Sequence, residues 1–136
     1  MFTITNYNHD SLMVADVERS AAFYRDVLGM REVPRPATFD FAGKWFRCGT
    51  AEIHLIGASG APQAPGDLPN AEPHRARARH IAFEIADMDE TVRHLQAQGI
   101  PIVAGPRPRG DGPVQVYVCD PDGHLIELCT RAATAG

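Results

Sequence analysis

The chain of 136 residues has little lysine and no long hydrophobic segment. Lys44 is the only lysine among 13 basic residues, and 17 acidic residues bring the net charge to −4, which excludes the basic footprint of most nucleic-acid-binding proteins. The apolar runs are too short for a transmembrane helix. The N-terminal MFTITNYNHD has neither the basic nor the apolar region of a signal peptide, so a cytoplasmic protein is predicted. We expect one globular domain that binds neither nucleic acid nor membrane.

Cysteine is also scarce. Cys48, Cys119 and Cys129 are an odd number and form no CxxC pair, which argues against a disulfide framework and fits a reducing compartment. Each lies in an apolar, strand-like run. The interpretation that fits this setting is a small buried hydrophobic side chain, and the alternative is a catalytic nucleophile.

What the chain does have is an internal repeat. Residues 9–16 read HDSLMVAD and residues 80–87 read HIAFEIAD, so both copies begin with His and end with Ala-Asp. Apolar residues at helical spacing follow each aspartate, and a glycine follows each helical pattern, at Gly29 and Gly99. Each half of the chain therefore predicts a strand, an aspartate-capped amphipathic helix and a glycine stop.

Three further strands are expected in each half. The predicted ranges are 31–33, 44–48 and 52–56, then 100–104, 114–119 and 124–130. Both halves read βαβββ, so we predict an α+β fold in which two paired βαβββ modules form an open, cleft-shaped sheet with helices outside. The whole chain, 1–136, is expected to be one domain, with module one at 1–56, a linker rich in proline and glycine at 57–79 and module two at 80–136.

Side chains alternate between the two faces of a strand, so the repeat predicts which residues share a face. Leu12 and Val14 lie on one face of the first strand and His9 on the other, and the second copy places His80 in the same way. The aliphatic faces are expected to pack on the helices. Both histidines are then left on the inner face, at equivalent positions of the two modules.

The last strand of each module adds one polar residue. Glu127 stands in an otherwise apolar strand, where a carboxylate is costly to bury without a partner. His54 holds the corresponding place in AEIHLI of the first module. Imidazoles and a carboxylate around one point are typical ligands of a first-row divalent metal ion. We predict one such ion per chain (Zn, Ni, Fe or Mn), held by His9, His80, Glu127 and His54, where His54 is alternatively a supporting or substrate-contacting group.

These residues give the chain a resemblance to a known family over nearly its whole length. It resembles the vicinal oxygen chelate superfamily, the group of glyoxalases, bleomycin-resistance proteins and dioxygenases, and within it bacterial proteins similar to glyoxalase I. The motifs that carry the resemblance are His9 with Val14-Ala-Asp16, Ser20-Ala-Ala-Phe-Tyr24, Leu28-Gly29, His80 with Asp87, and Asp120-Pro-Asp-Gly-His124 followed by Glu127.

The resemblance implies a ligand order and an activity. His9 would be the first ligand, His80 the third and Glu127 the last, and the second falls at His54, where glyoxalase I usually has a carboxylate. Glu127 is then the one acidic ligand and the expected catalytic base. The implied function is that of a metal-dependent lyase or isomerase of glyoxalase I (lactoylglutathione lyase) type. Its substrate would be a small oxygenated or thiol-conjugated metabolite, chelated through two adjacent oxygens. The resemblance also implies a homodimer.

Other functions stay open at this point. They are an extradiol-type dioxygenase, a thiol transferase that opens epoxides, and a metabolite- or drug-binding protein without catalysis. A fourth ligand at His54 would fill a position that oxygen chemistry needs open, and the complete ligand set argues against a non-catalytic protein. Candidate substrate contacts are Trp45 at the pocket entrance, Arg47 and Arg109 as cations for an anionic tail, and Tyr117 in the strand after the Arg109 loop.

Overall fold

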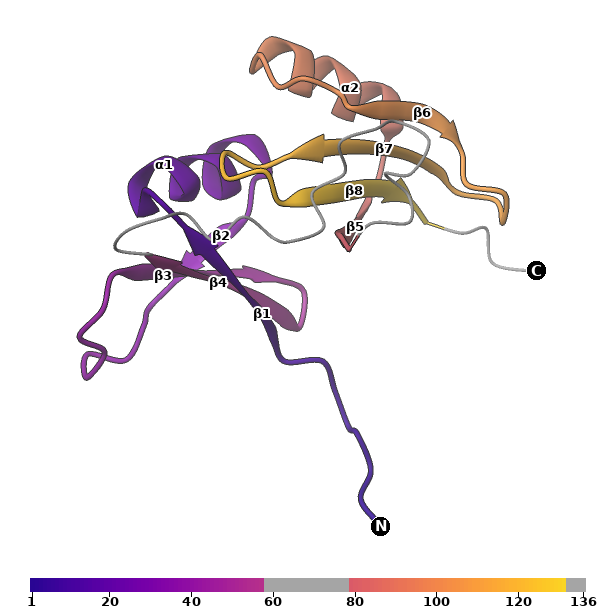
Figure 1. Ribbon diagram of the computed structural model, residues 1–136. Coiled ribbons are helices and arrows are strands. Elements are labelled where there is room, and N and C mark those ends of the chain that lie inside the picture. The colour runs from indigo at the N-terminus through magenta and orange to yellow at the C-terminus, as the bar shows by residue number, and fades with distance from the viewer. Residues whose placement is uncertain (58–78, 132–136) are drawn as a thin grey trace. The chain divides into compact units, whose positions relative to one another are not determined.

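The computed structural model describes residues 1–57 and 79–131. The chain divides into two compact units, Met1–Gln63 (unit 1) and Ala64–Gly136 (unit 2), and each contains one four-stranded sheet (Figure 1). Residues 58–78 of the predicted linker lie outside the described residues. Both units have the element order βαβββ, so the predicted α+β class with two βαβββ modules is confirmed.

Unit 1 is a mixed sheet with one helical segment. Strand β1 pairs in parallel with β4, and the antiparallel pairs β4–β3 and β3–β2 complete the order β1-β4-β3-β2. The helix passes directly into a π-helical turn, η1, which the sequence pattern did not predict. The elements are β1 (His9–Val14), α1 (Val17–Ala22), η1 (Phe23–Val27), β2 (Arg31–Val33), β3 (Gly43–Cys48) and β4 (Ala51–Gly57).

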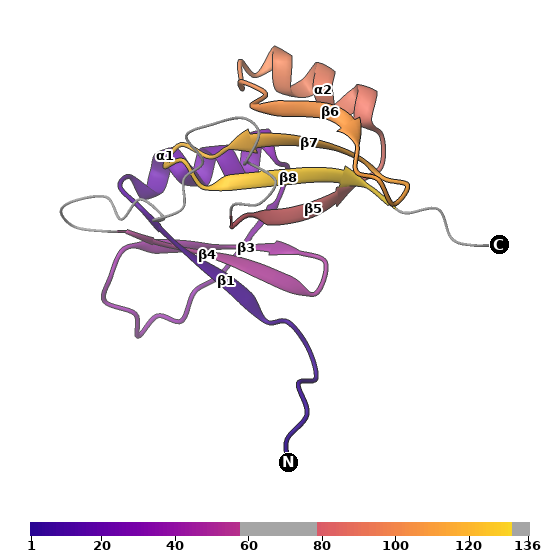
Figure 2. The same cartoon turned by 45° about the vertical axis from the view of Figure 1, so that its right-hand side comes forward.

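Unit 2 repeats this topology. Its strand order is β5-β8-β7-β6, with β5 parallel to β8 and the other pairs antiparallel. Helix α2 lies along one face of the sheet (Figures 1 and 2) and buries Leu95. The elements are β5 (Ile81–Ile85), α2 (Met88–Ala97), β6 (Ala104–Pro108), β7 (Val114–Cys119) and β8 (Leu125–Thr130).

The strand registers show which residues of the two units correspond. In each sheet the strand between the parallel and the antiparallel neighbour carries one buried polar residue, flanked by a small residue on the parallel neighbour and an aromatic residue on the antiparallel neighbour. The two rows are Ser11, His54 and Trp45 in unit 1, and Ala82, Glu127 and Tyr117 in unit 2. The correspondence of His54 and Glu127 that the sequence predicts is therefore present in the pairing of the strands.

The predicted separation of faces is also observed in unit 1. Leu12 and Val14 are buried on the helix side of β1, while Ser11 and Met13 are exposed on the opposite side. Tyr24 of η1 is fully buried and lies against Phe46 of β3, with ring centroids 6.2 Å apart. The apolar side of the sheet therefore binds the helical segment, and the polar side remains available for chemistry.

Local signals at the helix ends behave as expected. The side chains of Asp16 and Asp87 each accept a hydrogen bond from the backbone N–H three residues later, at 3.0 and 2.9 Å. Gly29 and Gly99 follow the two helical segments with φ of +69° in both cases, a conformation that only glycine adopts at low cost. Among the described residues, no helix combines the length and the apolar character needed to cross a bilayer.

One strand prediction is wrong. The range 100–104 was expected to be a strand, whereas β6 runs from Ala104 to Pro108. The predicted and the observed strand have only Ala104 in common. The sequence pattern around Pro106 and Pro108 does not predict a strand, because proline cannot donate a backbone hydrogen bond. β6 lies at the edge of its sheet, next to β7 alone, and an edge strand tolerates this loss.

Candidate metal and substrate site

Three aromatic rings from neighbouring strands stack in a row on the polar side of unit 1. Trp45 and His54 are parallel, with ring centroids 3.8 Å apart and an interplanar angle of 2°. His9 also stacks on His54, at 4.0 Å and 16°. Because β4 lies between β1 and β3, His54 is held between the other two rings and is only 8% exposed. The strand pairing thus fixes the plane of the His54 imidazole.

Hydrogen bonds set which nitrogen of each ring remains available. His54 Nε2 lies 2.9 Å from Glu52 Oε1, and His9 Nδ1 lies 2.7 Å from Asn8 Oδ1. Both partner oxygens are acceptors, so these two nitrogens carry the proton. In the neutral rings His54 Nδ1 and His9 Nε2 then hold the free lone pairs. A metal-binding histidine usually donates its other N–H to a carboxylate or carbonyl in this way.

Glu52 also binds Arg47. Arg47 Nη2 and Nε donate to Glu52 Oε2 at 2.6 and 3.2 Å, while Oε1 accepts from His54. The hydrogen bond from His54, followed by those from Arg47, holds the pKa of Glu52 below its usual range. An ionised Glu52 therefore keeps His54 in one tautomer and one orientation.

The corresponding polar group of unit 2 is centred on Glu127, which is 4% exposed. The Tyr117 hydroxyl donates to Glu127 Oε1 at 2.9 Å, and Arg109 Nη1 lies 4.0 Å from Oε2. Arg109 is itself held by Asp111, through Nε to Oδ1 and Nη2 to Oδ2 at 2.8 Å each. The buried carboxylate thus has one direct donor and a cation nearby.

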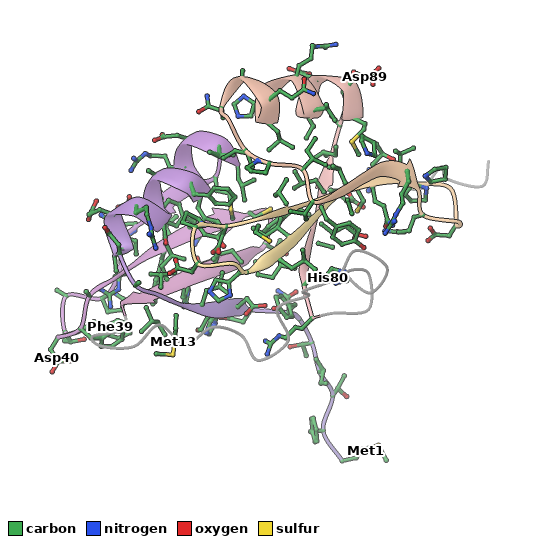
Figure 3. All side chains as sticks on the ribbon, turned by 45° about the horizontal axis from the view of Figure 1, so that its top comes forward. Met1, Met13, Phe39, Asp40, His80 and Asp89 are labelled. Carbon is green, nitrogen blue, oxygen red and sulfur yellow. The ribbon has the colours of Figure 1, made fainter. Side chains whose placement is uncertain are left out.

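Tyr117 connects Glu127 to the remaining predicted ligand of this unit. The His80 ring meets the Tyr117 ring edge-on, with centroids 5.5 Å apart and an angle of 84°, and His80 is labelled just before β5 in Figure 3. Burial raises the pKa of Tyr117 to about 12, and its bond to the Glu127 carboxylate contributes to this shift. Tyr117 is therefore a neutral phenol that donates to Glu127 at physiological pH.

The eight residues that the sequence singled out fall into two groups of four. Unit 1 brings together the first group, and unit 2 the second. The groups are His9, Trp45, Arg47 and His54, and His80, Arg109, Tyr117 and Glu127. Each group contains two predicted metal ligands and two predicted substrate contacts.

The sequence reasoning missed the two residues that orient the imidazoles of unit 1, Glu52 and Asn8. Glu52 could have been found, because it stands two positions before His54 in the same strand and so shares its face. Asn8 precedes the strand that begins at His9, where alternation gives no guidance.

The environment of Cys129 does not support the alternative that this cysteine is a catalytic nucleophile. Cys129 is buried, its Sγ donates to the Phe83 carbonyl at 3.6 Å, and burial raises the pKa of its thiol. A reactive cysteine needs the opposite, a lowered pKa and access to solvent. Cys129 therefore matches the expected small hydrophobic residue, whereas Cys48 is exposed and Cys119 half-buried.

Comparisons with known proteins bear on the same regions. The family model of the Glyoxalase/Bleomycin resistance protein/Dioxygenase superfamily matches residues 6–128. Lactoylglutathione lyase of Haemophilus influenzae is 34% identical over 134 residues, covering 93% of each chain. Metallothiol transferase FosB of Staphylococcus saprophyticus is 28% identical over 132 residues, covering 93% of this chain and 78% of its own.

A solved structure supports the fold assignment. A glyoxalase family protein of Bacillus anthracis superposes with a TM-score of 0.77 at 28% identity, over 96% of this chain and 98% of its own. The family match spans both modules, and the relatives include both a lyase and a thiol transferase. The chain therefore belongs to the Glyoxalase/Bleomycin resistance protein/Dioxygenase superfamily.

Proposed function

We propose that the protein is a divalent-metal-dependent lyase or isomerase of glyoxalase type, with a small oxygenated or thiol-conjugated metabolite as substrate. The observation that carries this proposal is the equivalence of His54 and Glu127 in the two sheets, each beside an aromatic residue of the next strand. It accounts for a polar residue at a buried central position in both modules. The lactoylglutathione lyase relative supports this reaction class.

The proposed ligands are His9, His54, His80 and Glu127. Among residues 1–57 and 79–131, no group of three or more His, Cys, Asp or Glu side chains is arranged to hold a metal ion. Two of the four proposed ligands belong to each unit. The donors fit a first-row ion: the two imidazoles of unit 1 keep a lone pair, and Glu127 Oε2 accepts no direct hydrogen bond from the described residues.

The residues of the chain then have separate tasks. A bound ion would polarise the substrate carbonyl and stabilise the negative charge that develops on its oxygen. Glu127 moves the substrate proton through its carboxylate, while the Tyr117 hydroxyl on Oε1 fixes the orientation of that carboxylate. Trp45 and Arg47 in unit 1, and Arg109 and Tyr117 in unit 2, are the proposed substrate contacts.

The test is the metal content of protein purified without chelator. We expect about one divalent ion per chain in the wild type. Changing His9, His80 or Glu127 to Ala should remove the ion and the turnover of a hemithioacetal. His94→Ala, on the exposed surface of α2, is the matched control and should keep both. Full occupancy in all three ligand variants would show that the ligand assignment is wrong.

A second candidate is a thiol transferase that opens an epoxide, which the FosB relative favours. Both reactions use a metal-held substrate oxygen, so the ligand variants do not distinguish them. Parallel assays do: loss of a hemithioacetal in one, and thiol consumption with an epoxide in the other. Turnover of the epoxide alone would reject the lyase in favour of the transferase.

A further inference from the structure

A pocket of about 340 Å³ opens on the polar side of the unit 1 sheet. It lies over β2, the start of the loop after it, β3 and the beginning of β4. Its walls are formed by Arg31, Glu32, Val33, Pro34, Trp45, Arg47 and Glu52. Every one of these residues belongs to unit 1. Trp45 and Glu52 also contact His54, so the pocket adjoins the proposed metal ligands of this unit.

Among the described charged residues around the pocket, one cation, Arg31, is not paired with an acidic side chain. Glu52 is paired with Arg47 at 2.6 Å. Glu32 alternates to the opposite face of β2, where Lys44 lies 3.4 Å from it and 3.7 Å from Glu18. The Arg31 side chain makes no hydrogen bond or ion pair with any residue of the described parts of the chain. On the polar face of the sheet, Arg31 and Arg47 against Glu52 therefore leave one net positive charge.

Arg31 lies opposite another cation, although no acidic side chain of the described residues pairs with it. It stands directly opposite Arg47 in the register of β2 and β3. Like charges at directly opposite positions destabilise a pair of strands unless an anion lies between them. Arg47 uses Nε and one Nη2 proton on Glu52, so further N–H groups remain on it. Both guanidinium groups could therefore donate to the same incoming anion.

The remaining walls are apolar. Val33 is the register partner of Trp45, and Pro34 follows it, so these side chains flank the two arginines. The Trp45 ring is fixed by its stacking on His54 and by an edge contact with Phe39, at 5.7 Å and 72°. Figure 3 labels Phe39 in the loop between β2 and β3. A ligand that reaches the arginines must therefore place an apolar body against Trp45.

We propose that this pocket is a binding site for a monocarboxylate: the carboxylate lies between Arg31 and Arg47, and the apolar part of the ligand packs on Trp45, Val33 and Pro34. A single net positive charge matches a carboxylate better than a phosphate dianion. The role of this pocket as part of the substrate site rests on the proposed function. In that role, it indicates that the substrate is a carboxylic acid. As a carboxylate site, it depends on unit 1 alone.

Trp45 is the only tryptophan of the chain, so its fluorescence reports binding without any activity measurement. The experiment titrates metal-free protein with cyclohexanecarboxylate, with the neutral cyclohexanecarboxamide and with cyclohexyl phosphate. We expect a saturable change with the carboxylate, and binding at least about tenfold weaker for the amide because charge-assisted hydrogen bonds are lost. The phosphate should bind no more tightly than the carboxylate.

Two variants locate the site. Arg31→Gln should weaken carboxylate binding by roughly tenfold or more, since it removes the guanidinium group that is not paired with an acidic side chain of the described residues. Arg93→Gln, on the exposed surface of α2, should leave binding unchanged. Circular dichroism checks that both variants fold, and Arg31→Lys, which keeps the charge but not the planar donors, should lie between wild type and Arg31→Gln.

The outcomes distinguish failure of the carboxylate site from failure of the proposed metal site. Equal binding of acid and amide, tighter binding of the phosphate, or an unchanged affinity in Arg31→Gln would overturn the carboxylate site. The same titration in Glu127→Ala should give the wild-type affinity, because the pocket contains no residue of unit 2. If carboxylate binding persists while no variant affects metal content, the pocket stands and the proposed function fails.

Discussion

His54 is restrained by three neighbouring side chains. Trp45 and His9 stack on its ring, and Glu52 accepts a hydrogen bond from its Nε2. Rings held in this way lose little freedom when they bind a ligand, which favours a preorganised site. The same restraints would also suit a group that only supports its neighbours. An experiment must therefore decide between a ligand and a supporting role.

We predict that His54→Ala weakens metal binding without abolishing it, because His9, His80 and Glu127 still supply three ligands. The loss should exceed the roughly 10- to 100-fold effect typical of removing a residue that merely orients a ligand. Metal titration of the wild type and the variant measures it. His54→Glu should keep the metal and raise hemithioacetal turnover, since glyoxalase I usually has a carboxylate there. An affinity unchanged in His54→Ala would reject the four-ligand site but not the other three ligands.

Tyr117 predicts how stability depends on pH. Its pKa rises from 10.0 to about 12 on folding, so the folded chain retains this proton over a range in which the unfolded chain loses it. The free energy of unfolding should therefore fall as pH rises from 10 towards 12, by at most roughly 3 kcal/mol from this one residue. Denaturant unfolding of metal-free protein at several pH values measures the slope.

The matched variants identify the source of that slope. Tyr117→Phe should remove the Tyr117 contribution, since phenylalanine carries no proton to lose. Tyr7→Phe, at a position that is 61% exposed, should retain the wild-type slope. A slope unaltered by Tyr117→Phe would assign the alkaline loss of stability to other groups.

At the scale of elements, the helix starts were readable because their signals are local. Asp87 caps α2 through a side-chain bond to the N–H of Glu90. We predict that Asp87→Ala lowers the free energy of unfolding by about 1 kcal/mol, because that N–H loses its acceptor. Asp87→Asn keeps an acceptor oxygen and should cost only a few tenths of that. Equal losses in both variants, measured by chemical denaturation, would attribute the effect to charge instead of the cap.

β6 illustrates the limit of such local signals. Proline argues against a strand wherever both neighbours need hydrogen bonds, but β6 has a neighbour on one side only. Its position at the edge depends on the order of all four strands of unit 2. No window of the sequence around residues 104–108 contains that information.

At the scale of the whole molecule, we propose that the protein is a homodimer, as the resemblance to its superfamily implies. Sedimentation of purified protein at micromolar concentration should give twice the chain mass of 14.8 kDa. The companion measurement is the metal content of the same sample, since each unit contains two of the proposed ligands. A monomer that still binds one metal ion per chain would show that the dimer is not needed for the site.

The sequence by itself determined the repeat, the capped helices, the fold class and the corresponding polar positions His54 and Glu127 in the two sheets. It could do so because a period of two along a strand and a cap at a helix start depend on residues close together in the chain. Only the tertiary structure revealed that Glu52 and Asn8 set the imidazole tautomers, that Tyr117 donates to Glu127, and that Arg31 faces Arg47 beside Trp45. The contacts of Tyr117 with Glu127 and of Arg31 with Arg47 join neighbouring strands, and strand register is a property of the paired sheet that no single segment encodes.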